Sequence, residues 1–302
     1  TLTMGYWEEL KEKIKEKEYV EFQQVRYRNE QTVAMKINGM PVSTNRLKTD
    51  YTVEKVYNSR HDIMQLAFNI DDNIVSVFPT QYQAGMDMVV DLEKIKCKAV
   101  INVDMNTGHI GEIVNHKEVV EAWEDYKEHF RDKYKFLRSS ATQNAVQQFL
   151  ETQDKLILDQ EMMKAEMNSK MFYMLVFDHY LVGKQEYNEP YAITFPSQLF
   201  KGISFPMTMT PKIHQESPNK VVYDRNGSVD EHATSSSDIV QFYDEQFKPT
   251  IQYKFTQYRA SFNIRETVNE AERHIENAEV RLIEEVVNNI DLTILCKLRK
   301  IE

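Results

Sequence analysis

The chain has 302 residues, enough to bury a large core as one big domain or two modest ones. It carries 47 acidic against 37 basic residues, a net charge of -10, and a protein that neutralises phosphates needs a basic face. The longest apolar cluster, which contains Met171 to Val176, is far shorter than the roughly 18 residues of a membrane span. We therefore expect neither a nucleic-acid partner nor a transmembrane segment.

The pattern of the chain predicts a short leading segment followed by one large domain. Residues 1–18 read as a charged helix or tail, and 19–302 as a single α+β domain. Within that domain we expect a β-rich part, a helical insert and a second β-rich part, at residues 19–114, 115–182 and 187–302.

Strand patterns dominate the first β-rich part. Thr32 to Ile37 followed by Asn38-Gly39 predicts a strand and a hairpin turn. Apolar and polar residues alternate from Ile95 to Met105, which predicts a strand that reverses at Asn106-Thr107-Gly108 and returns as Ile110 to Val114. Further strands are expected at Tyr51–Tyr57, Ile63–Ile70 and Ile74–Phe78. Together these segments indicate an antiparallel meander.

Two helical regions make up the insert. Asn115 has the chemistry of a helix N-cap, and Glu118 stands where a capping box places its acidic partner. The apolar stripe of the first helix comprises Val119, Trp123, Tyr126, Phe130, Tyr134 and Leu137. The second region runs from about Thr142 to Tyr180, and its apolar side comprises Val146, Phe149, Leu156, Met163, Met167, Met171 and Met174. The insert therefore predicts a helical layer against the sheet.

The last third is predicted to return to strands. Phe195 to Pro206 contains prolines that restrict it to edge strands or loops, and Asp224 to Asp238 reads as an exposed loop. Ile251 to Ile264 predicts a long aromatic strand, and Ile290 to Leu298 a closing one. Residues 266–286 fit a helix or a strand, and the alternation from Ile275 favours the strand.

These elements predict the α+β class. We expect a large curved antiparallel sheet, half-barrel-like, that is covered by two or three central helices.

Motifs for catalysis or metal binding are missing from the sequence. Asp104 to Ile110 comes nearest to a calcium loop, but its glycine stands one position early and a ligand is missing, which favours a plain hairpin turn. The eight histidines form no zinc pattern, and no nucleophile elbow or phosphate-binding glycine loop occurs. We expect a non-catalytic protein without metal or cofactor, and a hydrolase with an unmotified site stays as an alternative. The two cysteines, Cys97 and Cys296, are expected to be buried free thiols, with a disulfide as the other reading.

Fourteen methionines are unusual for this length, and five of them crowd one helix. Flexible thioethers fill irregular cores, and they also line adaptable apolar surfaces. We predict an apolar cleft between sheet and helices that takes a lipid-like ligand or a protein partner. Its lining is predicted to comprise Trp123, Phe130, Met163, Met167, Met171 and Phe172. The alternative is a protein–protein module, such as an immunity, inhibitor or secretion-accessory factor, whose acidic surface meets a basic partner.

One run carries a family resemblance. From Asp104 to Trp123 the chain reads Asp-x-Asn-Thr-Gly-x-Ile-x-x-Ile-x-Asn-x-x-x-Val-x-x-x-Trp, which resembles uncharacterised proteins of Bacteroidota similar to the LolA/LppX-like class of envelope proteins. The resemblance implies an antiparallel half-barrel closed by helices that carries or senses apolar ligands without catalysis. It also favours the cell envelope over the cytoplasm, although the first residues, Thr1 to Met4, show no signal peptide. It assigns no binding residues.

Overall fold

The computed structural model describes residues 4–133, 140–183, 188–229 and 237–301. These residues divide into two compact units, each assembled from separate stretches of the chain. Unit 1 is made of Thr1–Val25, Tyr51–Ile70 and Met88–Phe177, and unit 2 of Arg26–Asp50, Asp71–Asp87 and Asp178–Glu302. The prediction that 19–302 is a single domain stays a prediction.

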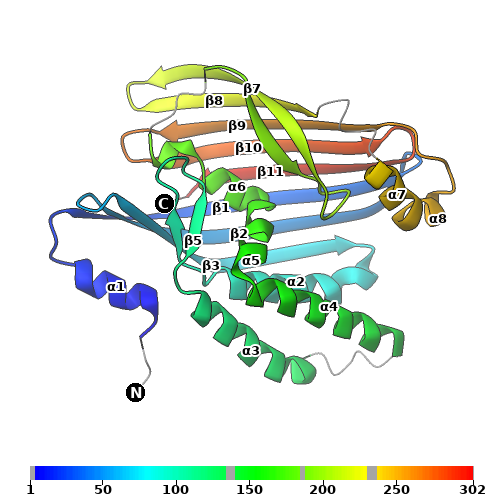
Figure 1. Ribbon diagram of the computed structural model, residues 1–302, viewed down its shortest axis with the longest axis horizontal. Helices are drawn as coiled ribbons and strands as arrows, with labels where there is room; N and C mark the ends of the chain where they lie inside the picture. Colours follow the sequence, from blue (N-terminus) through cyan, green and yellow to red (C-terminus); the bar gives the residue numbers. More distant parts are fainter. Residues whose placement is uncertain (1–3, 134–139, 184–187, 230–236, 302) are drawn as a thin grey trace. The chain divides into compact units, whose positions relative to one another are not determined.

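Eleven strands form one antiparallel sheet in the order β5-β4-β3-β2-β1-β11-β10-β9-β8-β7-β6 (Figure 1). The strands are β1 Val20–Ile37, β2 Met40–Asn58, β3 Ile63–Phe78, β4 Ile101–Val103, β5 Ile110–Ile113, β6 Tyr191–Pro196, β7 Ser204–Ser217, β8 Lys220–Val229, β9 Tyr258–Asn269, β10 His274–Val286 and β11 Ile290–Lys300. Because β5 and β6 are its two edges, the sheet stays open. The predicted α+β class with a large open antiparallel sheet is confirmed.

Among the described helices, α1 precedes the first strand and the others lie between strands along the chain. The helices are α1 Tyr6–Ile14, α2 Gln83–Lys96, α3 His116–Lys133, α4 Ser140–Leu158, α5 Gln160–Asn168, α6 Met171–Val176, α7 Ser237–Gln246 and α8 Lys248–Ile251, with short 3-10 turns at Thr80–Tyr82 and His179–Leu181. Among the described helices, none combines the length and apolar character that crossing a bilayer requires.

Several predicted elements are confirmed. Asn38 and Gly39 join β1 to β2 with φ of 51° and 77°, the pair of positive values that a tight hairpin needs. The insert folds as α3 to α6, and residues 275–286 form a strand within β10. Asp104 to Gly108 is a turn between β4 and β5, where the amide of Gly108 donates to the carbonyl oxygen of Asp104 at 2.7 Å.

The strand predicted from Ile95 to Met105 is wrong over most of its length. Helix α2 runs through Lys96, and only Ile101–Val103 is a strand. The buried residues Met88, Leu92 and Ile95 recur at spacings of four and three, which is the helical period. The alternation after Ile95 therefore arose where a helix ends and a short strand begins.

Two predictions in the last third are also wrong. The predicted loop from Asp224 begins inside β8 and ends in α7, with residues 230–236 outside the described part. Gly227 is a packing glycine of β8, because a Cβ there would lie 2.5 Å from the sulfurs of Met207 and Met209. The predicted strand from Ile251 starts only at Tyr258, since Ile251 ends α8.

Asn115 does not cap α3 as predicted. Its side-chain oxygen accepts from the amide of Val100 at 2.7 Å, and its amide donates to the carbonyl of Lys98 at 2.8 Å. Glu118 accepts from the backbone amide of Tyr6 at 2.6 Å and from the side-chain amide of Asn115 at 3.3 Å, so the predicted pair is joined through the side chain of Asn115. Asn115 thus joins the start of α3 to the segment between α2 and β4, a contact between residues far apart in sequence.

Both cysteines are buried and free, as expected from the sequence. Cys97 follows α2, where its thiol lies 3.7 Å from the carbonyl oxygen of Phe68, and Cys296 lies in β11 beside the side chain of Asn29.

Candidate interaction face

The residues predicted to line a cleft all lie in unit 1 and are packed inside it. Their exposed fractions are at most 3%, for Trp123, Phe130, Met163, Met167, Met171 and Phe172. Phe172 stacks on Tyr51 with ring centroids 3.8 Å apart, while Trp123 and Phe130 share one aromatic series through Tyr126. The structure thus places Phe172 in one aromatic cluster and Trp123 with Phe130 in another. That these side chains receive a ligand stays a prediction. Tyr134 and Leu137 of the predicted stripe lie outside the described residues.

Helix α3 packs against α2 and α4 within unit 1. The indole nitrogen of Trp123 donates to Asp154 of α4 at 2.8 Å, and Lys127 reaches the same carboxylate at 2.6 Å. Phe130 packs with Met88 of α2, and Phe149 of α4 packs against that pair. Helices α2, α3 and α4 therefore share an apolar contact, and the hydrogen bonds of Trp123 and Lys127 to Asp154 join α3 to α4.

A buried lysine joins the helices of unit 1. The Lys96 ammonium, 1% exposed, donates to Glu166 at 2.6 Å and to Gln153 at 3.2 Å. Lys170 bonds to Glu93 and lies 3.6 Å from Glu166, so cations and carboxylates alternate. Burial, with a smaller effect of Lys170, lowers the pKa of Lys96. A buried amine with a lowered pKa can act as a nucleophile. The ammonium of Lys96, however, is hydrogen-bonded to the carboxylate of Glu166 and the amide of Gln153, so it links α2 to α4 and α5.

Unit 2 buries an arginine between two carboxylates. Arg225 of β8 donates to Asp178 at 2.7 Å and to Glu266 of β9 at 2.8 Å. All three side chains are at most 6% exposed. Asp178 also accepts from the backbone amide of His179 at 2.8 Å. The cluster thereby fixes the chain where it enters unit 2.

The two carboxylates of this cluster have opposite ionisation behaviour. Burial raises the pKa of Glu266 to about 7, an effect that Arg225 opposes and Asp178 reinforces. Burial works against the Asp178 carboxylate too, but Arg225 and His179 hold the pKa of Asp178 well below its usual range. Carboxylates with separated pKa values are typical of acid–base sites. Here both are enclosed beside a guanidinium, which is the arrangement of a structural ion cluster.

A third buried carboxylate fixes the loop after β6. Glu284 of β10 accepts from the hydroxyl groups of Ser197 and Tyr258 at 2.6 and 2.5 Å, and from the amides of Gln198 and Leu199 at 2.7 and 2.8 Å. Burial raises the pKa of Glu284, while these four donors favour its ionised form. Sequence patterns could not find this contact, because 87 positions separate Ser197 from Glu284.

The opposite face of the unit 2 sheet is exposed to solvent. Along β9 and β10 nearly every second side chain is buried, and the side chains between them, such as Arg265 and Glu279, point outward. We call these outward side chains of β6 to β11, with those of β1 from Arg28 to Lys36, the open face. It carries four rows of directly paired positions across the strands.

Two rows are charged and two are mainly neutral. Row 1 contains Lys212, Asp224, Arg265, Glu279, Lys297 and Glu30, from β7, β8, β9, β10, β11 and β1. Row 2 contains Thr210, Asn226, Asn263, Arg281, Leu295 and Thr32 on the same strands. Row 3 contains Ala192, Thr208, Ser228, Ser261, Ile283, Thr293 and Ala34, beginning on β6. Row 4 contains Arg259, Glu285, Asp291 and Lys36, from β9, β10, β11 and β1.

Row 1 alternates in sign at every one of its six strands. Opposite charges directly across from each other contribute roughly 0.2–1 kcal/mol per pair to strand pairing, so the alternation stabilises the register. The same alternation also presents an ordered pattern of charge to anything that meets this face.

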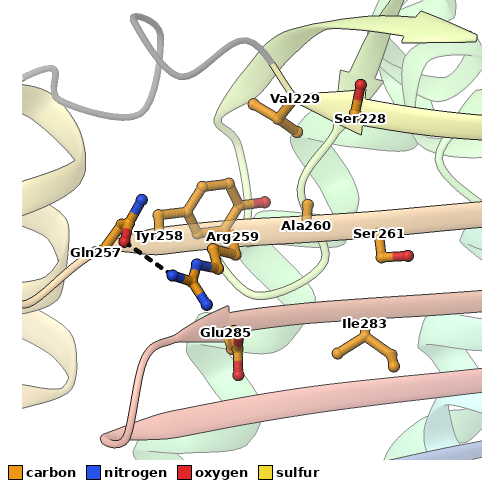
Figure 2. Close-up of a pocket in the computed structure, with 9 residues that line it drawn as sticks. All are labelled: Ser228, Val229, Gln257, Tyr258, Arg259, Ala260, Ser261, Ile283 and Glu285. Carbon is orange, nitrogen blue, oxygen red and sulfur yellow. Dashed lines mark hydrogen bonds between the residues drawn. The ribbon is translucent and has the colours of Figure 1, made fainter.

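A hollow of about 450 Å³ lies beside the row 3 residues of β8, β9 and β10 and the row 4 residues of β9 and β10. Figure 2 shows Ser261 and Ile283 on neighbouring strands, with Arg259 and Glu285 beside them. Arg259 donates to Gln257 at 3.3 Å. The lining mixes small, apolar, polar and charged side chains, namely Ser228, Ala260 and Ser261, Val229, Tyr258 and Ile283, Gln257, and Arg259 with Glu285.

Among the described residues, no group of three or more histidine, cysteine, aspartate or glutamate side chains is placed to hold a metal ion. His232 lies outside them.

Comparison with known proteins assigns no family. No family model matches the chain, and no curated protein matches it. This chain is similar to a solved structure of lipovitellin, from work on lipid–protein interactions in that protein. The TM-score is 0.43, and the identity is 13% over 93% of this chain. The chain spans about a quarter of that protein, 26% of its length, and a likeness this distant assigns no function.

Proposed function

We propose that this chain is a non-catalytic binding protein whose open face docks another protein. The observation that carries the proposal is the contrast between the two faces of the unit 2 sheet. One face buries its apolar side chains at nearly every inward position of β9, β10 and β11. The other displays paired rows of charge with neutral rows between them.

The composition of the open face supports this function. Leu295 is 46% exposed and Ile283 is half-buried, and both lie between the charged rows 1 and 4. A mainly neutral centre with a charged rim is the usual anatomy of a protein interface. The paired charges of row 1 would select a partner and fix its orientation, since charge complementarity gives specificity more than affinity.

A photo-crosslinking amino acid at position 293 tests the proposal in the cells that make the protein. Thr293 is a half-buried residue of row 3 on β11, so its replacement leaves the core unchanged. The matched control places the same probe at Glu151, an exposed position of α4 in unit 1. We expect a discrete adduct with a protein from position 293 and none from 151. Equal adducts from both positions, or none from 293, would contradict the proposal.

An apolar-ligand carrier in unit 1, of the kind the LolA/LppX resemblance implies, is the second candidate. The methionines Met163, Met167 and Met171 favour it, because flexible side chains can rearrange around a guest. Native mass spectrometry after gentle purification, with a fluorescent fatty acid titrated into the delipidated protein, tests this candidate. A clean apo mass together with no uptake would exclude it.

A further inference from the structure

We infer that the partner at the open face is a second copy of this chain, docked face to face across a two-fold axis parallel to the strands. The inference rests on the proposed function, because it names the partner of the same surface. It is carried by the order of charges in rows 1 and 4.

The symmetry has a simple consequence for the rows. A two-fold axis between two stacked sheets, parallel to their strands, keeps each row at its own level and reverses the order of the strands. With the axis between β9 and β10, strand β9 of one copy faces β10 of its partner. In the same way β8 faces β11, and β7 faces β1.

Row 1 is complementary to itself under this operation. Arg265 faces the partner's Glu279, Asp224 faces the partner's Lys297, and Lys212 faces the partner's Glu30. Each of these contacts occurs twice by symmetry. The complementarity depends on the even number of strands, because an alternating row of five or seven charges would meet itself with like charges opposed.

One pair of row 4 is complementary about the same axis, while Asp291 and Lys36 of that row have no row 4 residue opposite them. Arg259 stands on β9 and Glu285 on β10, so Arg259 faces the partner's Glu285. A two-fold axis perpendicular to the strands is disfavoured. It would exchange rows 1 and 4, setting Arg259 against the partner's Arg265 and Glu285 against the partner's Glu279. The charges therefore select one orientation of the two copies.

The centre and size of the face suit a dimer. Ser261 faces the partner's Ile283, and Asn226 faces the partner's Leu295, so small and apolar groups meet between the charged rows. At strand spacings of about 4.8 Å, the four rows cover on the order of 700 Å² per chain. A standard interface buries about 800 Å² per partner. We expect a reversible dimer that high salt weakens.

Charge reversal with rescue in trans tests the inference. Arg265→Glu alone opposes the partner's Glu279 with a like charge, and Glu279→Arg alone does the same to Arg265. In a mixed dimer of the two variants, the introduced glutamate of one copy faces the introduced arginine of the other. The symmetry-related contact keeps its native arginine and glutamate, so both contacts again pair opposite charges. Sedimentation velocity of each variant and of the mixture, from about 1 to about 100 µM at low salt, measures association.

We expect the wild type to dimerise, each single variant to associate about tenfold more weakly or worse, and the 1:1 mixture to regain a heterodimer. A wild type that stays monomeric at about 100 µM overturns the inference without any variant. So does a mixture no better than its components, or a single variant that dimerises like the wild type. Thermal melts of both variants establish that they are folded. An adduct from position 293 with a different protein would leave the proposed function standing while removing the second copy as its partner.

Discussion

The two units enclose their buried cations in different surroundings. In unit 1, Lys96 lies between helices and bonds to Glu166, whose side chain is 23% exposed and also lies near Lys170. In unit 2, Arg225 lies inside the sheet between Asp178 and Glu266, which are 6% and 0% exposed. The Lys96 network keeps access to water and a second lysine, while the side chains of the Arg225 cluster are enclosed. We therefore expect the loss of its cation to cost unit 2 more.

Replacement of the arginine should have the largest effect. Arg225→Met leaves two carboxylates in the interior without their cation, and breaking such a buried cluster costs about 3–5 kcal/mol. Urea unfolding of the wild type and the variant measures the difference. Arg46→Met, at an exposed position of β2 in unit 2, is the matched control and should change stability by less than about 0.5 kcal/mol. Equal midpoints for both variants would mean that the cluster does not stabilise the fold.

The pH dependence of stability sharpens the comparison. Because the pKa of Glu266 is raised to about 7, the folded protein holds a proton there that the unfolded chain has lost above its ordinary value of 4.5. This group therefore favours folding at low pH, and its contribution falls as pH rises from about 4.5 to about 7, by on the order of 2–3 kcal/mol. Asp178, with its lowered pKa, gives stability that is complete above its ordinary pKa and is lost only as pH falls below it.

Glu266→Gln isolates the contribution of Glu266 to the pH dependence of stability, because glutamine keeps the shape of the protonated acid and does not titrate. We expect the wild type to lose stability relative to the variant as pH rises across that window. Denaturant unfolding at several pH values measures it. Glu216→Gln, an exposed change on β7, should follow the wild-type profile. Parallel profiles for the wild type and Glu266→Gln would show that Glu266 is ionised throughout.

The lysine of unit 1 should be less costly to remove. Lys96→Met leaves Glu166 with Lys170 and with water, so we expect a loss of about 1–3 kcal/mol, below that of Arg225→Met. Chemical denaturation followed by tryptophan fluorescence suits this variant, since Trp123 lies in the same unit. Lys117→Met, whose side chain is 89% exposed, serves as control. A loss equal to that of Arg225→Met would remove the distinction between the two networks.

A smaller effect is expected where one donor among four is lost. Ser197→Ala removes the 2.6 Å bond to Glu284, and the acceptor keeps Tyr258 and two amides. We expect about 1 kcal/mol, read from the thermal midpoint. Ser204→Ala, at an exposed position of β7, should leave the midpoint unchanged. No shift in Ser197→Ala would indicate that the remaining donors hold the loop alone.

Local patterns predicted those parts of the fold that local chemistry decides. The Asn38-Gly39 hairpin, helix α3 and the closing strand β11 follow from turn residues and periodicity. The same periodicities gave a wrong prediction near Ile95, where a helix ends shortly before a strand begins. The polar sequence from Asp224 reads as a loop because its outward side chains serve an open face and Gly227 serves close packing.

The candidate face could not be predicted in the same way. Row 1 draws one residue from each of six strands, and its order exists only once Lys212 and Glu30 are placed in register, 182 positions apart in sequence. The methionines and aromatic residues indicated a site in unit 1. There these side chains are buried, which is usual for apolar residues and marks no site. The order of charges on this face becomes visible only from the pairing of the strands, and composition does not contain it.

Oxidative footprinting of matched exposed leucines tests the central proposal most directly. Leu295 of the open face is 46% exposed, and Leu158 of unit 1 is 51% exposed, so hydroxyl radicals should modify both at similar rates in dilute purified protein. In extract from the cells that make the protein, we predict that Leu295 becomes protected while Leu158 reacts as before. Equal reactivity of the two leucines in both preparations would contradict an interaction at the open face.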